Sequence, residues 1–396
     1  MSQHAPTHGR ILPGTLINGQ PATLGVMGGG QLGRMFVHAA QRMGYFTAVL
    51  DPDTASPAGL VSHHHIQTAY LDEQGLAQLM QRCAAITTEF ENVPAPALRT
   101  LGAQRPVAPS ADAVALAQDR AQEKAHFVRC GVPVAPHAVI ETAQQLAAVP
   151  DGLLPGILKT SRLGYDGKGQ MRVKTRAELA AAWAELKQVP CVLEKMLPLA
   201  AECSVIVARG ADGQLVHFPV QRNLHREGIL AVTEVHEGNV PADLAAQAIA
   251  ATKSIAEGLQ YVGVLCVEFF VLQDHTLVVN EMAPRPHNSG HYSIDACDHS
   301  QFDLQVRTLA GLPLVQPRLH SPSVMLNLLG EIWLDFNDVP PWDKVLALPG
   351  THLHLYGKLK ASKGRKMGHL TITGASVDEV RATALAAARI LGIAPF

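Results

Sequence analysis

The sequence lacks the features that mark secreted, membrane-spanning and nucleic-acid-binding proteins. No apolar stretch approaches the roughly 18 residues of a membrane span, and the N-terminus has no signal-peptide core. The net charge is only −2, which gives no support for nonspecific binding to nucleic acids or membranes. The six cysteines are widely spaced and form no C-x-x-C pair, so reduced thiols in a cytoplasmic protein are expected.

The sequence also lacks the residue spacings of several common catalytic centres. No Ser-His-Asp, Cys-His or zinc-ligand spacing stands out, and there is no internal repeat or low-complexity segment. The run His63-His64-His65 does not change this, because successive residues of a strand point to opposite faces and adjacent imidazoles cannot easily converge on one metal. We expect this run to be exposed.

The chain that follows residue 20 is rich in apolar runs at strand and helix spacing. Apolar residues make up 47% of the 396 residues, and a chain of this length suggests two or three domains. Strands at 23–27, 47–50 and 83–88 and a helix at 31–43 predict a parallel α/β unit, whose ligands should lie at the carboxyl ends of the strands. Residues 111–130 read as one Ala-rich amphipathic helix.

Pro- and Gly-rich segments at 131–136 and 313–317 mark further boundaries along the chain. The pattern after the first boundary is α+β, and it becomes strand-rich from residue 191. The expected parts are therefore a flexible leader (1–20), a parallel α/β domain (21–120), a small α+β unit (121–190), a strand-rich unit (191–312) and a small β-rich C-terminal domain (313–396).

Two apolar runs, 264–272 and 276–282, flank a short polar break and predict a β-hairpin that is buried on both faces. If Asp274-His275 is a two-residue turn, Glu268 lies directly opposite Glu281, and facing carboxylates repel unless a cation bridges them. The two carboxylates and the neighbouring Asn280 suit Mg²⁺ held together with nucleotide phosphates. A one-residue slip would separate the two carboxylates, and a solvated pair on a surface hairpin is the alternative.

The turn Gly28-x-Gly30-x-x-Gly33 follows a strand, opens a helix and precedes Asp51 at the end of the next strand. This spacing satisfies the dinucleotide fingerprint. The motif by itself indicates only an anion site, because glycines allow the backbone to approach a ligand closely and a helix N-terminus attracts any anion. The anion is either a cofactor pyrophosphate, as in a dehydrogenase, or a substrate phosphate.

A second Gly-rich loop, 164–170, lies between predicted strands at 156–159 and 171–174. Its backbone N–H groups and Lys168 suit a flap over a polyphosphate, although no Gly-Lys-Ser/Thr opens a helix as in a Walker A loop. Lys159, at the end of an apolar strand, strengthens the phosphate interpretation. An ordinary hairpin turn and a snorkelling surface lysine are the alternatives.

Three further groups of polar residues complete the candidate site. Residues 194–197 and Glu202 follow a strand and suit a hinge that holds a nucleotide, with solvated loop charges as the alternative. The loop 285–291 carries Arg, two His, Asn and Ser, and it suits oxyanions because Arg binds them bidentately. The basic cluster at 356–366 suits a phosphate, or else it is a solvated surface loop.

The phosphate flap, the strand lysine, the strand-linker Glu pair and the Glu…Asn-Glu hairpin occur in an order that resembles the ATP-grasp superfamily. Within it, the segments 28–35, 164–170, 223–225, 261–264, 280–291 and 364–369 resemble the 5-(carboxyamino)imidazole ribonucleotide synthetase family of de novo purine synthesis. The resemblance covers roughly residues 21–396. It implies an ATP-grasp fold with an N-terminal pre-ATP-grasp α/β domain and a small C-terminal domain that completes the substrate site.

The resemblance also implies a role for each matching residue. Glu268 and Glu281 would bind Mg²⁺, with Mn²⁺ as a substitute. ATP would contact Arg120, Lys159, Gly164, Tyr165, Asp166, Gly167, Lys168, Gly169, Gln170, Glu194, Lys195, Met196, Leu197, Glu202, His225, Asn280 and Glu281. The ribonucleotide would contact Gly30, Gln31, Leu32, Glu89, Arg285, His287, Asn288, Ser289, Lys358, Arg365 and Lys366. Tyr165, Asp166, Lys358 and Arg365 would act in catalysis.

The implied reaction uses small molecules alone: ATP, bicarbonate and 5-aminoimidazole ribonucleotide. Bicarbonate attacks the γ-phosphorus of MgATP, the resulting carboxyphosphate releases CO₂, and the aminoimidazole amine captures it in a site closed by the flap. A cytoplasmic homodimer is what the family implies.

Three alternatives remain at this point. A formate-dependent glycinamide ribonucleotide transformylase is disfavoured by Tyr165-Asp166 and by Asn288-Ser289. An NAD(P)-dependent dehydrogenase leaves Glu268 and Glu281 unexplained. A non-catalytic nucleotide sensor does not require the paired carboxylates.

Overall fold

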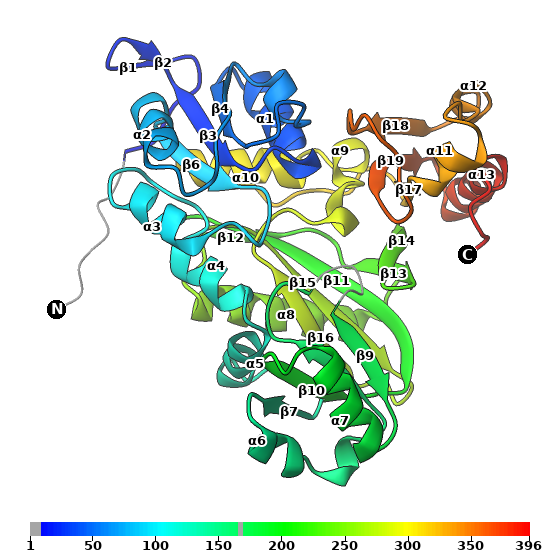
Figure 1. Cartoon of the computed structure of the whole chain (residues 1–396). Helices are drawn as coiled ribbons and strands as arrows, with labels where there is room; N and C mark the ends of the chain where they lie inside the picture. Colours follow the sequence, from blue (N-terminus) through cyan, green and yellow to red (C-terminus); the bar gives the residue numbers. More distant parts are fainter. Residues whose placement is uncertain (1–8, 165–168) are drawn as a thin grey trace.

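The computed structural model describes residues 9–164 and 169–396, and within these ranges the strands form four sheets. Figure 1 shows the N-terminal part in blue and cyan, a lower part in green, and the C-terminal part in orange and red. The chain is a mixed α/β protein, as the sequence predicts. No helix among the described residues has the length and apolar character needed to cross a membrane.

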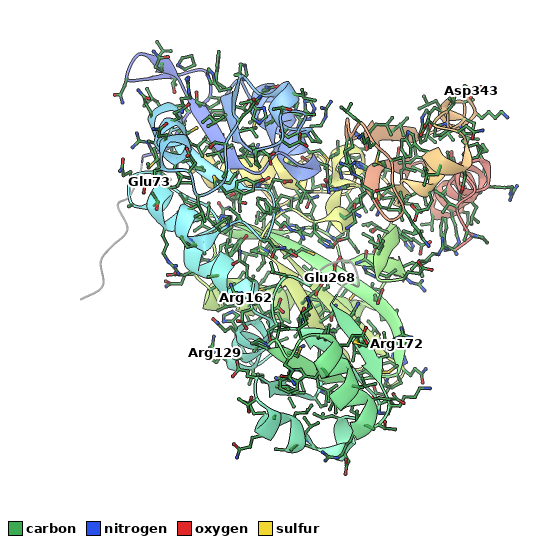
Figure 2. All side chains as sticks on the ribbon, in the orientation of Figure 1. Glu73, Arg129, Arg162, Arg172, Glu268 and Asp343 are labelled. Carbon is green, nitrogen blue, oxygen red and sulfur yellow. The ribbon has the colours of Figure 1, made fainter. Side chains whose placement is uncertain are left out.

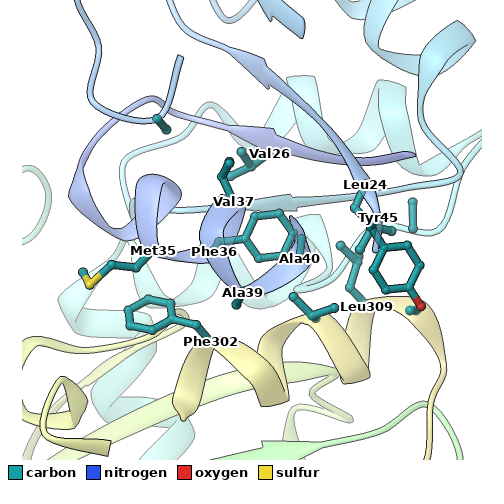
Figure 3. Packing of buried hydrophobic residues seen from close by; sticks show 14 of the residues in the cluster. Leu24, Val26, Met35, Phe36, Val37, Ala39, Ala40, Tyr45, Phe302 and Leu309 are labelled. Carbon is teal, nitrogen blue, oxygen red and sulfur yellow. The ribbon is translucent and has the colours of Figure 1, made fainter. Parts of the chain in front are cut away.

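The N-terminal part is a parallel sheet with strand order β5-β4-β3-β6, which confirms the predicted α/β unit. Its central strand is buried along its whole length. Phe36 on α1 is fully buried between this sheet and α10 (Gln301–Ala310), which supplies Phe302 to the same core (Figure 3). Burying one such side chain contributes about 1.5–3 kcal/mol. The elements are β3 (Thr23–Met27), α1 (Gln31–Arg42), β4 (Phe46–Leu50), η1 (Gly59–Val61), β5 (His64–Ile66), α2 (Glu73–Arg82), β6 (Ala85–Thr88) and α3 (Ala95–Gly102).

The segment predicted as one helix over 111–130 is two helices, α4 (Ala111–Ala117) and α5 (Arg120–Arg129). Asp119 interrupts them, because its side chain accepts hydrogen bonds from the amides of Ala121 and Gln122 and so caps the start of α5. This break was not predicted. It directs Arg120, the first residue of α5, toward the centre of the molecule, where it meets Glu281.

A small antiparallel sheet, with order β7-β10-β8-β9, forms the lower part of Figure 1. Strand β10 reaches Lys195, so Glu194 lies inside the strand and not in the linker that the sequence analysis expected. The helices and strands here are β7 (His137–Ile140), α6 (Ala143–Ala147), η2 (Asp151–Leu153), β8 (Gly156–Thr160), β9 (Gln170–Val173), α7 (Arg176–Glu185) and β10 (Cys191–Lys195).

The large sheet runs in the order β16-β15-β11-β13-β14-β17-β19-β18, with β12 paired to β11. Because β14 pairs with β17, the strands of the C-terminal part continue this sheet. Its elements are β11 (Leu199–Arg209), β12 (Leu215–His217), β13 (Gln221–Arg226), β14 (Ile229–Val235), α8 (Ala242–Gly258), β15 (Gly263–Leu272), β16 (Leu277–Ala283), η3 (Asn288–Gly290), α9 (Ser293–Ala296), α10 (Gln301–Ala310), β17 (Ser323–Leu329), α11 (Glu331–Asp335), α12 (Trp342–Leu346), β18 (Thr351–Leu355), β19 (Lys366–Thr373) and α13 (Val377–Ile390).

The β15–β16 hairpin has the predicted pairing of Glu268 with Glu281, but the predicted turn is wrong. Leu272 pairs with Thr276 across a three-residue loop, in which His275 has a positive φ of 63°. That loop shifts the register by one residue relative to a two-residue turn. An irregularity between Phe269 and Glu268 shifts it back, so the two carboxylates face each other after all.

Residues within the expected flexible leader are ordered and packed. Residues 16–17 and 20–21 pair as the short strands β1 (Leu16–Ile17) and β2 (Gln20–Pro21). Ile11 is buried in the N-terminal core; its amide donates to Ala310 and its carbonyl accepts from the Tyr45 hydroxyl. The segment from Ile11 therefore belongs to the folded N-terminal part, and residues 1–8 lie outside the described residues.

Candidate active site

A cavity of about 890 Å³ lies where the N-terminal part, the small sheet and the large sheet meet. Figure 2 labels Glu268 near the centre of the molecule, between these parts. Most of the residues predicted for the site line the cavity: Gln31, Leu32, Glu89, Arg120, Lys159, Gly164, Gly169, Gln170, Glu202, His225, Glu268, Asn280, Glu281, Arg285, His287, Asn288 and Lys366.

One wall of the cavity rests on a buried group of two lysines and one carboxylate. Lys159 Nζ lies 3.0 Å from Glu194 Oε2, and Lys124 Nζ, fully buried, lies 3.2 Å from Glu194 Oε1. Burial alone would raise the pKa of Glu194, but the two lysines outweigh it and hold the pKa at about 2. The triad carries a net charge of +1, and Lys159 presents it to the cavity. This excess of positive charge at the cavity suits the binding of a polyphosphate.

Arg120 and Glu123, both on α5, connect this wall to the hairpin. Arg120 lies 3.4 Å from Glu281 Oε2, and Glu123 accepts a hydrogen bond of 2.7 Å from the amide of Met282. Burial raises the pKa of Glu123 to about 8, against the opposing effect of Arg120. Glu123 and Lys124 were not predicted. A helical Glu-Lys pair looks like ordinary surface charge, and only the tertiary fold buries it.

The hairpin supplies the hard oxygen ligands of a candidate metal centre. Glu268 and Glu281 are paired across β15 and β16, with side chains 12% and 43% exposed. Asn280 Oδ1 is buried and has no hydrogen-bond partner among the described residues. Two carboxylates and an amide oxygen without a partner, all lining the same cavity, fit a hard divalent cation.

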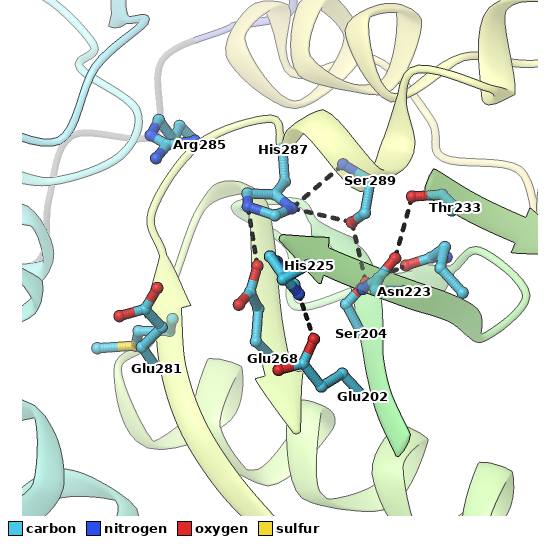
Figure 4. Close-up of polar contacts among 12 residues, drawn as sticks. Glu202, Ser204, Asn223, His225, Thr233, Glu268, Glu281, Arg285, His287 and Ser289 are labelled. Carbon is cyan, nitrogen blue, oxygen red and sulfur yellow. Dashed lines mark hydrogen bonds and ion pairs between the residues drawn. The ribbon is translucent and has the colours of Figure 1, made fainter. Parts of the chain in front are cut away.

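Two histidines contact the carboxylates around this centre (Figure 4). His287 Nε2 lies 3.0 Å from Glu268 Oε1, and His225 Nδ1 contacts Glu202. Burial would raise the pKa of Glu268, but His287 lowers it to about 2. For His225, burial lowers the pKa and Glu202 more than reverses this effect. Glu268 is therefore ionised at neutral pH, as a metal ligand requires.

The first Gly-rich turn binds carboxylates of the protein itself. Glu89 accepts hydrogen bonds from the amides of Gly30 and Gly33 at 3.0 and 3.2 Å, and Asp51 accepts from Gly29 at 2.7 Å. An added Cβ at Gly30 would lie 2.6 Å from Glu89 Oε1, so glycine is required by close approach. Because Glu89 takes the amides at the start of α1 and Asp51 also accepts from the Tyr70 hydroxyl, the dinucleotide interpretation fails.

The loop after the hairpin brings Arg285 and Asn288 to the cavity. Arg285 lies 2.6 Å from Glu91 Oε2, a residue that the sequence analysis did not single out. Both polar atoms of the buried Asn288 side chain lack partners among the described residues. A buried amide that lines a cavity and has no partner within the described part of the protein is suited to hydrogen bonding with a polar ligand.

The C-terminal basic cluster is only partly directed at the cavity. Lys366 lines it, whereas Lys358 donates to the carbonyl of Lys366 at 2.6 Å. Arg365 is exposed and donates to the carbonyl of Lys360. Lys358 and Arg365 do not line the cavity in this structure.

Other predicted residues also lie off the cavity surface. The amides of Lys195 and Met196 donate to Pro136 and Pro155, and Leu197 packs beside Leu272. Glu194 lies beneath Lys159, and Ser289 is fully buried. Tyr165, Asp166, Gly167 and Lys168 lie outside the described residues.

A histidine cluster lies beside the cavity, where α9 meets the C-terminal strands. Asp295, His354 and His369 place ligand atoms within 4.8 Å of one another. The His354 and His369 rings are stacked at 12° with centroids 4.5 Å apart, so their nitrogen lone pairs lie in nearly parallel planes. These lone pairs do not converge on one metal ion, and the cluster joins the two parts through the His354–Asp295 contact of 2.8 Å.

Comparison with known proteins assigns the chain to a family. Models of the ribonucleotide synthetase preATP-grasp domain, the ATP-grasp domain and the phosphoribosylaminoimidazole carboxylase C-terminal domain match residues 21–118, 125–302 and 323–383. The N5-carboxyaminoimidazole ribonucleotide synthase of Brucella melitensis is 43% identical over 357 residues, which cover 88% of this chain and 96% of that protein. The chain belongs to the N5-carboxyaminoimidazole ribonucleotide synthase family. It is an ATP-grasp ligase that forms a carbon–nitrogen bond.

Solved structures agree with this assignment. The N5-carboxyaminoimidazole synthetase of Staphylococcus aureus complexed with ADP has a TM-score of 0.87 and 37% identity, covering 96% of this chain and 98% of that one. The Aspergillus clavatus enzyme in complex with ADP and 5-aminoimidazole ribonucleotide has a TM-score of 0.86 and 31% identity, covering 94% and 99%. Membership of the ATP-grasp ligases confirms the resemblance and removes the dehydrogenase alternative.

Proposed function

We propose that the central cavity performs the reaction of the family, the ATP-dependent carboxylation of 5-aminoimidazole ribonucleotide in purine biosynthesis. The arrangement of charged side chains around the cavity is the observation that supports placing the reaction there. Lys159 and Arg120 line the cavity together with the paired carboxylates Glu268 and Glu281, and Arg120 lies 3.4 Å from Glu281. Cations for a polyphosphate beside carboxylates for a metal are what ATP-dependent phosphoryl transfer requires.

We further propose that the divalent cation is Mg²⁺, with Mn²⁺ as a substitute. Glu268, Glu281 and Asn280 would hold it, because all three offer oxygen and Asn280 Oδ1 has no other partner among the described residues. When bound, the ion neutralises charge on the transferring phosphoryl group. Arg120, 3.4 Å from Glu281, keeps that carboxylate oriented toward the same space.

The phosphates of ATP would lie against Lys159, with the triad beneath it fixing the ammonium group. Glu194 accepts a hydrogen bond from Lys159 and forms an ion pair with Lys124, so its role is to position the cations. Glu202 and His225, which contact each other at the cavity wall, are the proposed ribose side of the nucleotide site. The flap 164–170, whose described ends Gly164 and Gly169 line the cavity, would cover the phosphates.

The ribonucleotide would occupy the other end of the cavity, between the first Gly-rich turn and the loop 285–291. Gln31 and Glu89 line this end from the N-terminal part, and Arg285, Asn288 and Lys366 line it from the others. Bicarbonate attacks the γ-phosphorus, ADP leaves, and the carboxyphosphate breaks down to phosphate and CO₂. The exocyclic amine then attacks CO₂ and loses a proton, and we propose Asp166 and Lys358 as the groups that position or deprotonate it, with Lys358 leaving the carbonyl of Lys366 to reach the amine.

A homodimer and a cytoplasmic location complete the proposal. The near-neutral net charge of −2 and the six free cysteines support a reducing compartment without membrane contact.

The test is ADP release from MgATP and bicarbonate, with and without 5-aminoimidazole ribonucleotide. The expected result is release that the ribonucleotide stimulates and that Glu268→Gln abolishes. Asp274→Asn, a matched carboxylate-to-amide change at the exposed tip of the same hairpin, should leave the rate unchanged. Stimulation by glycinamide ribonucleotide and formate instead would transfer the chain to the transformylase reaction.

A further inference from the structure

A continuous chain of buried hydrogen bonds leads from the large sheet to the candidate metal ligand Glu268 (Figure 4). It begins at Thr233 on β14, whose hydroxyl donates to Asn223 Oδ1 at 3.0 Å. Asn223 Nδ2 donates to Ser204 Oγ at 2.8 Å, and Ser204 Oγ lies 2.9 Å from Ser289 Oγ. All four side chains are less than a tenth exposed.

The chain ends on His287, which lies between Ser289 and Glu268. Ser289 Oγ lies 2.9 Å from His287 Nδ1, and the backbone amide of Ser289 lies 3.3 Å from the same nitrogen. On the opposite side of the ring, His287 Nε2 lies 3.0 Å from Glu268 Oε1. One imidazole therefore bridges a buried network and a carboxylate.

The direction of these bonds follows from the backbone amide. An amide N–H can only donate, so His287 Nδ1 accepts from Ser289, and in the neutral ring the proton lies on Nε2. That proton points at Glu268 Oε1. The Ser204 hydroxyl donates to Gln221 Oε1 at 3.0 Å and accepts from Asn223 Nδ2. The Ser289 hydroxyl lies 2.9 Å from both Ser204 Oγ and His287 Nδ1, so these two atoms are the acceptors open to its proton.

We infer that Ser289 and Ser204 are positioning residues, which fix His287 as its Nε2–H tautomer and thereby orient Glu268 toward the divalent cation. This inference rests on the proposed function of Glu268 as a metal ligand. It assigns Ser289 a different role from substrate contact, because its side chain is buried behind His287 and does not line the cavity.

The consequence for the metal centre is geometric. With Oε1 held by His287, Glu268 has its other oxygen available to the cation, and the carboxylate cannot rotate freely. Hydrogen bonds that orient a metal ligand in this way are commonly worth about 10–100-fold in metal affinity or activity. A network anchored on three strands of the large sheet, β11, β13 and β14, holds the ligand more rigidly than a loop residue would.

The experiment compares Ser289→Ala and Ser204→Ala with Ser323→Ala. Ser323 is as buried as Ser204, but its hydroxyl has no hydrogen-bond partner among the described residues, so its truncation controls for the loss of a buried hydroxyl alone. The first readout is the ¹⁵N shifts of the His287 ring in the metal-free protein. The second is the affinity for Mn²⁺ with ADP, and the third is the KM for ribonucleotide.

The expected wild-type spectrum shows the Nε2–H tautomer of His287. Ser289→Ala removes the hydroxyl beside Nδ1 but keeps the backbone amide, so the Nε2–H tautomer should be less populated than in the wild type without being lost. Mn²⁺ affinity should fall about tenfold in Ser289→Ala and less in Ser204→Ala, with the KM for ribonucleotide unchanged. The Ser289→Ala/Ser204→Ala double variant should lose less Mn²⁺ binding free energy than the two single variants together, because both residues act through one hydrogen-bond network.

An Nδ1–H tautomer in the wild-type protein would overturn the inference, as would equal Mn²⁺ affinity in Ser289→Ala and Ser323→Ala. A raised KM for ribonucleotide with unchanged Mn²⁺ affinity would return Ser289 to substrate binding. Failure of the proposed function gives a different result, because wild-type protein would then bind no Mn²⁺ while the His287 tautomer stayed as described.

Discussion

The buried triad of Lys124, Glu194 and Lys159 gives the sharpest stability prediction. Replacing Glu194 by Gln leaves two ammonium groups beneath the cavity without their counter-charge. The pKa of this carboxyl is 4.5 in an ordinary setting and about 2 here, which corresponds to about 3 kcal/mol of stabilisation by the folded state. Breaking a buried ion pair on one side costs about 3–5 kcal/mol in other proteins, so the two estimates agree.

A second substitution separates charge repulsion from loss of packing. Lys124→Met removes one of the two stranded ammonium groups, so it should relieve part of the cost of Glu194→Gln. The double variant should therefore be more stable than the sum of the single effects by about 1–3 kcal/mol. Lys124→Met alone should cost less than Glu194→Gln, because the Glu194–Lys159 pair remains.

Urea unfolding followed by Trp183 fluorescence measures these differences. Trp183 lies on α7 in the core of the small sheet, and the other two tryptophans, in the C-terminal part, can be replaced by Phe. The folded-state pKa of Glu194 is lowered, so its contribution is full above pH 4.5 and is lost as the pH falls toward 2. The cost of Glu194→Gln should shrink across that window. The reasoning would be refuted if the losses of unfolding free energy in Glu194→Gln and Lys124→Met were additive at pH 7. A loss below about 1 kcal/mol in Glu194→Gln would also refute it.

Three further predictions follow from the same structure. Burial raises the pKa of Glu123 to about 8 from 4.5, so the folded chain retains a proton that the unfolded chain has lost, and wild-type stability should fall between those pH values. The free energy of unfolding of Glu123→Gln, measured by urea titration at pH 5 and 8.5, should fall less between these pH values than that of the wild type. An equal fall in both proteins would count against the raised pKa of Glu123. Gly30→Ala should displace Glu89, destabilise the protein by about 1–3 kcal/mol and raise the KM for ribonucleotide. Gly152→Ala, with open space around its Cβ, should change neither the stability nor the KM. Lys366→Ala should raise that KM about tenfold, as expected for one charge-assisted hydrogen bond, and the exposed Lys363→Ala should not; equal effects would place the phosphate elsewhere.

The parts of the fold that sequence reasoning predicted are those with local signals. The strand over 23–27 and the hairpin around Glu268 and Glu281 carry apolar runs whose length and turn residues are visible in the chain. The pairing of the two carboxylates was correct although the turn was wrong, because a longer loop and an irregularity near Phe269 cancel. The break before Arg120 was missed, since a helical pattern continues through it and only the Asp119 cap marks it.

The electrostatic part of the site depends on tertiary contacts that no local pattern contains. Lys124, Lys159 and Glu194 come from α5, β8 and β10, and nothing near them in sequence indicates that one carboxylate holds two lysines. The contact of Glu194 with ATP came from the family resemblance and stays a prediction, and Lys124 was not singled out. Ser289 was grouped with the substrate residues on the family resemblance, and the structure buries its side chain fully.

The central claim is that this cavity activates bicarbonate by phosphorylation. The most direct test uses ¹⁸O-labelled bicarbonate with MgATP and 5-aminoimidazole ribonucleotide, followed by mass spectrometry of the phosphate released. The attacking bicarbonate oxygen becomes the bridge of carboxyphosphate and stays with phosphorus when CO₂ leaves, so phosphate should carry one ¹⁸O. Unlabelled phosphate formed together with carboxylated ribonucleotide would contradict the mechanism.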